Sequence, residues 1–185
     1  MRRGRDAVRG TSLSADESLV ATSSQTVGPF FHFGLTTAAN GRMIDRLRAR
    51  GEPVTLAIRV TDGAGEPVPD AMIELLQAGA FGRLPTDENG VCEFATARPG
   101  RVAGPGPSGQ APHIFACVFA RGLLRHLHTR IYFAGDPGIE TDPVLARVPE
   151  GRRGTLIATP DPGRSGRWIF DLRLQGSGET VFFDG

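Results

Sequence analysis

The chain has little net charge, few cysteines and no long apolar run, and each shortage argues against a class of protein. Its 185 residues carry a formal net charge of +1, which gives no electrostatic reason to bind nucleic acid or an anionic membrane surface. No apolar run approaches the roughly 20 residues of a membrane-spanning helix. The two cysteines, Cys92 and Cys117, stand in apolar runs without CxxC spacing, so we expect small buried side chains and a reducing, cytoplasmic compartment.

Common catalytic motifs are missing as well. The sequence has no GxSxG nucleophile elbow, no GxxxxGK[ST] phosphate loop and no GxGxxG motif in a βαβ context. A serine hydrolase of the α/β type, a P-loop enzyme and a dinucleotide-binding enzyme therefore find no support.

Short strands joined by tight turns dominate what is there. Glycine (25 residues) and proline (14 residues) are spread along the whole chain. Residues 53–61 alternate apolar and polar side chains, which predicts a half-buried strand. We expect further strands at 71–78, 91–96, 112–120, 127–134, 155–159 and 167–175, and a last apolar segment at 180–183. With about seven to eight strands and almost no helix, the sequence predicts an all-β, single-domain β-sandwich. Because strand 112–120 is apolar on both faces, we expect it to be central and covered on both sides.

The N-terminal part divides into a tail and an arm. Residues 1–24 are polar and aperiodic, and we expect a flexible tail. Residues 25–52 form a separate arm, followed by the sandwich domain at 53–185. Pro29 biases Gly28 away from helix, so the segment QTVGPFFHFGL is expected to run extended or turned. Its three phenylalanines need cover from this chain's sheet or from a partner.

Three histidines gather at residues 113–128 and raise the question of a metal site. His126 and His128 alternate along one strand, so their imidazoles share a face. A cupin-like site would also need a nearby carboxylate, and none follows until Asp136. We therefore interpret His126 and His128 as locally hydrogen-bonded residues, and His113 as a satisfied core histidine.

Several segments together resemble one enzyme family. They are QTVGPFFHFGL, DGAGEPVPDAMIELLQA, APHIF, HLHTRIYFAGDP and LQGSGETVFFD, and from about residue 24 to the C-terminus the chain is similar to the intradiol ring-cleavage dioxygenases. More narrowly, it is similar to the α chains of members that act on protocatechuate. The resemblance implies a prealbumin-like β-sandwich core. It also implies an oligomer of αβ pairs, in which the β subunit is the partner and holds Fe(III).

The family's chemistry is what this resemblance implies for function. Two tyrosinates and two imidazoles hold the ferric iron, since hard Fe(III) favours anionic oxygen donors. The catecholate substrate chelates the iron, and O2 opens the ring between the two hydroxyl-bearing carbons. For protocatechuate the product is 3-carboxy-cis,cis-muconate, in the β-ketoadipate route of aromatic catabolism.

Carrying the ligand motif over residue by residue mostly fails. The tyrosine positions correspond to Leu84 and Val102, and the HxH pair becomes His113-Ile114-Phe115. The chain's one tyrosine, Tyr132, lies away from both ligand positions. The resemblance therefore implies that this chain holds no catalytic residue and no metal.

The α chains of the family instead line the substrate pocket opposite the iron. By resemblance, Thr26, Gly28 and Pro29 take that role, since glycine allows close backbone approach and proline holds a loop in shape. Arg130 is the candidate to bind the protocatechuate carboxylate. The plainer alternatives are that the arm only docks by hydrophobic packing and that Arg130 is a solvated strand-edge residue.

Two other interpretations exist for the whole chain. One is a stand-alone prealbumin-like binding or scaffold module without enzyme activity, because DxxGxPV occurs in such domains. The other is a metal-dependent cupin, which lacks its acid. The TVGPFF arm together with the HLHTRIYF strand favours the dioxygenase subunit, because a simple module needs neither.

Overall fold

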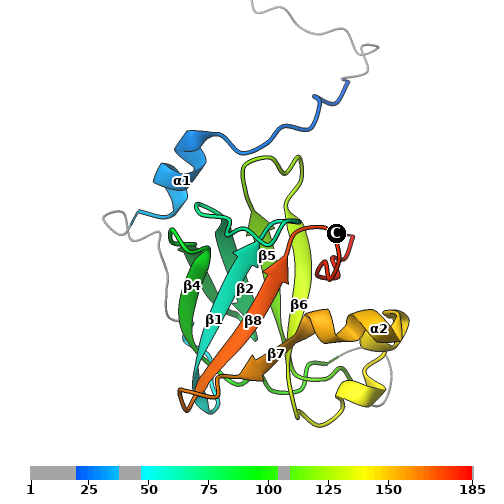
Figure 1. Cartoon of the computed structure of the whole chain (residues 1–185). Coiled ribbons are helices and arrows are strands. Elements are labelled where there is room, and N and C mark those ends of the chain that lie inside the picture. Colours follow the sequence, from blue (N-terminus) through cyan, green and yellow to red (C-terminus); the bar gives the residue numbers. More distant parts are fainter. Residues whose placement is uncertain (1–19, 38–46, 104–108, 185) are drawn as a thin grey trace, which may run out of the picture.

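The computed structural model describes residues 20–37, 47–103 and 109–184. Eight strands form the body of the molecule (Figure 1). Their bounds are β1 Pro53–Thr61, β2 Met72–Gln77, β3 Ala80–Pro85, β4 Val91–Ala97, β5 His113–Phe119, β6 Leu127–Phe133, β7 Ile157–Pro160 and β8 Arg167–Arg173. The helices are short: α1 Pro29–Leu35, α2 Glu150–Arg153 and the 3-10 turns η2 Ile139–Thr141, η3 Leu145–Arg147 and η4 Gly154–Leu156.

The strands build one curved sheet in the order β3-β2-β5-β6-β7-β8-β1-β4. β7 pairs with β6 on one side and with β8 on the other, so it joins two leaves that face each other. The two ends of the sheet approach one another: at the end of β2, the Gln77 side chain donates to the Ala97 carbonyl of β4 (2.8 Å) and accepts from the Thr96 hydroxyl (3.0 Å). The predicted all-β sandwich is confirmed, in the form of a sheet that nearly closes into a barrel.

The core lies between the two leaves and follows from strand alternation. Every second side chain of β1 points inward, so that Leu56, Ile58 and Val60 are fully buried. From the opposite leaf, Ile114 and Val118 of β5 meet them in the same cluster. This inner face stabilises the fold, and the outer face of β5 is left for other contacts.

Three details differ from the sequence prediction. The strand β3 was not predicted, because Gly82 and Pro85 in a six-residue run hide its period-two pattern. The terminal segment 180–183 forms no strand. Phe183 makes a β-bridge to His128, and Thr180 and Val181 make further hydrogen bonds to Arg173, Thr155 and Thr129. The arm is not extended throughout, since α1 begins at Pro29. Proline fits the first turn of a helix because its missing N–H has no partner there.

The N-terminal prediction is tested only in part. Most of the tail predicted at 1–24 lies outside the described residues. Figure 1 shows α1 standing beyond the ends of the strands rather than on the sheet. None of the helices in the described ranges has the length and apolar content needed to cross a bilayer.

Candidate functional site

The outer face of β5 and β6 carries most of the residues singled out from the sequence. Ile114, Ala116 and Val118 point into the core, so that His113, Phe115, Cys117 and Phe119 point outward. Phe115 keeps 43% of its surface exposed, and Cys117 is only partly buried. β5 is central, as expected. Its outer face is covered at the His113 end, where His113 is buried, but not at Phe115, so the expectation of cover on both sides was wrong for that part of the strand. Apolar side chains on an uncovered sheet face indicate a contact with another molecule.

Arg130 is the central polar residue of this face. It stands opposite Phe115 in the antiparallel β5–β6 pair, and its guanidinium carbon lies 5.0 Å from the Phe115 ring centroid and 5.8 Å from that of Phe183. Its Nη1 donates to Gln110 Oε1 (2.8 Å) and approaches the Tyr132 hydroxyl (3.5 Å). Arg130 is thus a held, half-buried cation in the middle of a paired strand, and the alternative of a solvated strand-edge arginine does not describe it.

The buried carboxylate of Asp142 accepts hydrogen bonds from several residues near Arg130. Asp142 accepts hydrogen bonds from the backbone N–H groups of Ala111, Val144 and Leu145 at 2.8–2.9 Å and from the Tyr132 hydroxyl at 3.2 Å. Burial raises the pKa of Tyr132 to about 12. The phenol therefore stays protonated at neutral pH and acts as a hydrogen-bond donor to Asp142.

His113 lies beside this network without taking part in it. Its Nδ1 is 2.8 Å from the Ala111 carbonyl, and its buried Nε2 has no hydrogen-bond partner among the described residues. Burial lowers the pKa of His113, and the nearby Arg130 adds to the effect. A neutral ring that donates from Nδ1 to Ala111 leaves the Nε2 lone pair bare. The prediction of a fully satisfied core histidine was therefore wrong.

The residues at the four family ligand positions do not fit a ferric ion. His113 and Phe115 share the outer face, where their rings make an edge contact at 4.8 Å between centroids. Leu84 instead belongs to the inner core between the leaves. Val102 lies in a loop, bridged to Gln110. One imidazole and three hydrocarbon side chains on different faces offer no anionic oxygen donors, so these four residues do not make the family's iron site.

The arm docks at the turn between β5 and β6. The Thr26 hydroxyl accepts a hydrogen bond from the Gly122 N–H (2.7 Å), and the Phe31 ring lies 5.3 Å from that of Phe119. Gly28 has open space around it, because a Cβ built there meets nothing within 4 Å. Arg130 lies farther along β6, in mid-strand. The structure brings Thr26, Gly28 and Pro29 to one end of the hairpin and does not join them to Arg130 directly.

The structure also reveals a group that sequence reasoning dismissed. Cys117 lies opposite His128 in the β5–β6 register, and His126 lies beside both. The strands are joined by residues 120–126, a longer connection than the short Arg121-Gly122 turn expected from the sequence, so the turn residues alone do not indicate which residues face one another. The sequence prediction treats Cys117 as a small buried side chain and does not pair it with the histidines.

Comparison with known proteins decides the family. No family model matches the chain. The protocatechuate 3,4-dioxygenase alpha chain of Burkholderia cepacia is 39% identical over 90% of this chain and 98% of its own length. The alpha chain of Pseudomonas putida is 38% identical over 91% and 98%. The chain belongs to the protocatechuate 3,4-dioxygenase alpha-chain family.

The other comparisons agree with this alpha-chain family. The beta chain of Burkholderia cepacia is 29% identical over 89% of this chain and 80% of its own. Among solved structures, the dioxygenase domain of a dioxygenase carbohydrate-binding fusion from Streptomyces sp. SirexAA-E superposes with a TM-score of 0.55, covering 69% of this chain and 82% of that one at 24% identity. The chain is therefore a member of the intradiol ring-cleavage dioxygenases, oxidoreductases whose chemistry implies iron.

Proposed function

We propose that the chain is the non-iron-binding α subunit of a protocatechuate 3,4-dioxygenase. It pairs with a β subunit that holds Fe(III), and the assembly of αβ pairs cleaves protocatechuate with O2 to 3-carboxy-cis,cis-muconate. The observation that carries the proposal is the near full-length likeness to alpha chains combined with hydrocarbon side chains at three of the four ligand positions. A likeness to a beta chain as well fits two related chains that assemble.

The uncovered apolar surface supports the partner. Phe115 and Leu76 stand next to each other across β5 and β2, and both are about half exposed. On the arm, Phe30 is 84% and Phe33 65% exposed. Burial of large apolar side chains drives association, so we assign this face and the arm to the β subunit. In this assembly the arm of residues 25–52 is an interface and pocket segment, and residues 53–185 are the dioxygenase-like domain.

The arm's backbone supports a pocket role for Thr26, Gly28 and Pro29. Nothing within the described part of the chain requires a glycine at position 28, since its surroundings are open. Because the fold of this chain does not require glycine at position 28, we explain the glycine by a bound molecule that comes close to its backbone. In this proposal that molecule is the substrate at the partner's iron. The hydrogen bond from the Gly122 N–H to the Thr26 hydroxyl, which holds this part of the arm against the hairpin, supports that role.

Arg130 is proposed to bind the carboxylate of protocatechuate. One amino group of its guanidinium is engaged by Gln110, and the fork keeps further N–H donors for a bidentate contact. The two flanking rings hold it in place and shield it from water. A cation held in this way strengthens attraction to an anion.

Co-expression tests the proposal. The full chain is produced alone and together with a β chain of the family, and iron content and visible spectrum are recorded for both. We expect a colourless, iron-free chain alone. The co-purified pair should show the tyrosinate-to-iron charge-transfer band and protocatechuate cleavage. Stoichiometric iron in the chain alone, or a chain that never pairs and remains a stand-alone sandwich module, contradicts the proposal.

The two unpaired cysteines suit a reducing compartment. We therefore assign the complex to the cytoplasm.

A further inference from the structure

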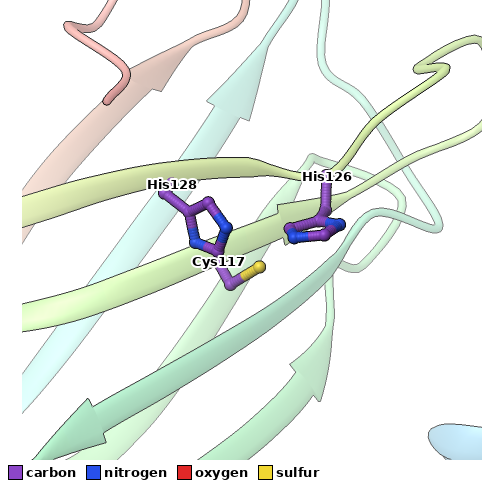
Figure 2. A group of neighbouring side chains, drawn as sticks. All are labelled: Cys117, His126 and His128. Atoms are coloured by element: carbon purple, nitrogen blue, oxygen red, sulfur yellow. The ribbon is translucent and has the colours of Figure 1, made fainter. Parts of the chain in front are cut away.

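Cys117, His126 and His128 form a compact group on the outer face of the β5–β6 hairpin (Figure 2). Each side chain offers one ligand atom, and these atoms all lie within 4.8 Å of one another. The His126 and His128 rings meet edge to face with centroids 4.6 Å apart. In Figure 2 the Cys117 sulfur points toward the space beside the two imidazoles. Three potential metal ligands therefore lie together, and the proposed dioxygenase function gives none of them a role.

The fold brings these residues together by strand register. Cys117 of β5 is the direct antiparallel neighbour of His128 in β6, and a residue two positions away on the same strand faces the same side. His126 precedes β6 and is oriented by stacking on Phe119, 5.3 Å between centroids at an interplanar angle of 27°. The backbone of His128 is fixed by the Phe183 N–H, which donates to its carbonyl at 2.8 Å. Cys117 and His128 therefore rest on paired strands, and His126 stands at the end of the connecting loop, next to β6.

From this geometry we propose that Cys117, His126 and His128 bind one Zn²⁺ ion. One thiolate and two imidazoles are a donor set typical of zinc, and three protein ligands leave the fourth tetrahedral position to water. With Zn–N and Zn–S bonds of about 2.0 and 2.3 Å, ligand atoms in a tetrahedral site are roughly 3.5 Å apart. Rotation of the two histidine side chains toward Cys117 closes the remaining gap of about 1 Å.

The acidic residue on the neighbouring strand is already paired with an arginine. Glu74 of β2 is the neighbour of Cys117 on its other side, so a carboxylate stands in the same row across three strands. Its Oε1 accepts from Arg83 Nε at 2.7 Å in an ion pair with that guanidinium, so the three ligand groups themselves are what favours a cation here. Zinc binds the thiolate form of cysteine, so the Cys117 thiol proton passes to solvent as the Zn–S bond forms.

The donors of this site differ from those of the family's iron site. Ferric iron favours hard anionic oxygen ligands, whereas a thiolate with two imidazoles suits Zn²⁺. The zinc proposal does not depend on the proposed dioxygenase function, and it fails or holds separately. A zinc ion here would fix His126, which stacks on the same Phe119 that receives Phe31 of the arm.

The experiment measures metal binding directly. The full chain, alone and as the co-expressed complex, is stripped with a chelator and dialysed against Zn²⁺, and zinc and iron are determined separately by mass spectrometry. We expect one zinc per chain, whether or not iron accompanies the partner. Titration with Co²⁺ as a spectroscopic probe should give a thiolate-to-cobalt charge-transfer band and tetrahedral d–d bands.

Single substitutions identify the ligands. Cys117→Ser and His128→Gln should each weaken zinc binding by at least about tenfold, since even changes outside the ligand shell cost 10–100-fold. Cys117→Ser should abolish the charge-transfer band. His126→Gln tests the second imidazole ligand and should weaken zinc binding in the same way. The matched control is Cys92→Ala, a core cysteine of the opposite leaf, which should keep both the band and the affinity. Absence of bound zinc in the unaltered chain, or unchanged affinity in Cys117→Ser and His128→Gln with a native circular dichroism spectrum, overturns the proposal.

Discussion

Replacing Asp142 by asparagine tests whether the buried carboxylate organises the site. Asp142 is 1% exposed. Its Oδ1 accepts from Tyr132, Val144 and Leu145, and its Oδ2 accepts from the Ala111 N–H at 2.8 Å. An amide oxygen can replace one of these atoms. The amide nitrogen then points its own hydrogens at the N–H it faces, so a buried donor is left without an acceptor.

The magnitude follows from the hydrogen bonds that are lost. An unsatisfied buried donor costs about 1–3 kcal/mol, and a hydrogen bond to a charged group contributes about 1 kcal/mol more than a neutral one. Removing a buried charge offsets part of this, because a neutral amide costs less to desolvate. We expect Asp142→Asn to lower the free energy of unfolding by about 2–4 kcal/mol. For a chain of this size that corresponds to a fall in Tm of roughly 5–15 °C.

Thermal and urea unfolding measure this effect. The control is Asp171→Asn, which removes an equally charged residue from an exposed ion pair with Arg59, with side chains 61% and 56% exposed. Exposed pairs contribute about 0–1 kcal/mol, so the control should scarcely change Tm. If Asp142→Asn lowers stability by less than about 1 kcal/mol, or no more than the control does, the carboxylate does not organise this region.

Four further outcomes are expected. Arg130→Ala should raise KM for protocatechuate more than for catechol in the αβ complex, and equal effects would rule out a carboxylate role. Gly28→Ala should leave the unfolding free energy of the chain within about 0.5 kcal/mol while raising KM in the complex; an unchanged KM would remove Gly28 from the pocket. Phe115→His restores the HxH pattern and should bind no Fe(III) when the chain is assayed for metal. Because burial lowers the pKa of His113, the unfolded chain takes up a proton below about pH 6.5 that the folded chain does not. The free energy of unfolding should therefore decrease as the pH is lowered below about 6.5, and it should decrease less steeply in His113→Gln. Parallel profiles of unfolding free energy against pH for the two proteins would contradict this.

The sequence predicted the sheet well because alternation is a local signal. The strand of residues 53–61 repeats apolar side chains at period two, and the structure gives β1 those bounds. β3 was missed because glycine and proline interrupt a run of six residues. The helix α1 was missed because Pro29 disfavours helix at the residue before it, whereas in the first turn of a helix proline itself is tolerated.

The exposure of the outer face of β5 could not be predicted, because it depends on contacts with residues far away in the sequence or in another molecule. A strand apolar on both faces has the same pattern whether its own chain or a partner covers it, and Phe115 is exposed in this chain. The approach of Cys117 to His128 depends in the same way on hairpin register. Residue types along one strand do not reveal it, and pairing across two strands does.

Phe115, at a predicted ligand position, and Arg130 are best understood together. The guanidinium carbon of Arg130 lies 5.0 Å from the Phe115 ring, directly across the strand pair. A phenylalanine ring attracts a cation through its π face, whereas an imidazole at the same position would compete as a base or, when protonated, repel it. The aromatic ring of Phe115 therefore supports the positive charge that the proposed substrate carboxylate requires. By this reasoning Phe115→His has two expected effects. It gains no iron, because Leu84 faces the inner core, and it loosens Arg130, so that KM for protocatechuate rises toward that of Arg130→Ala. A Phe115→His complex with the original KM would show that Arg130 does not depend on Phe115.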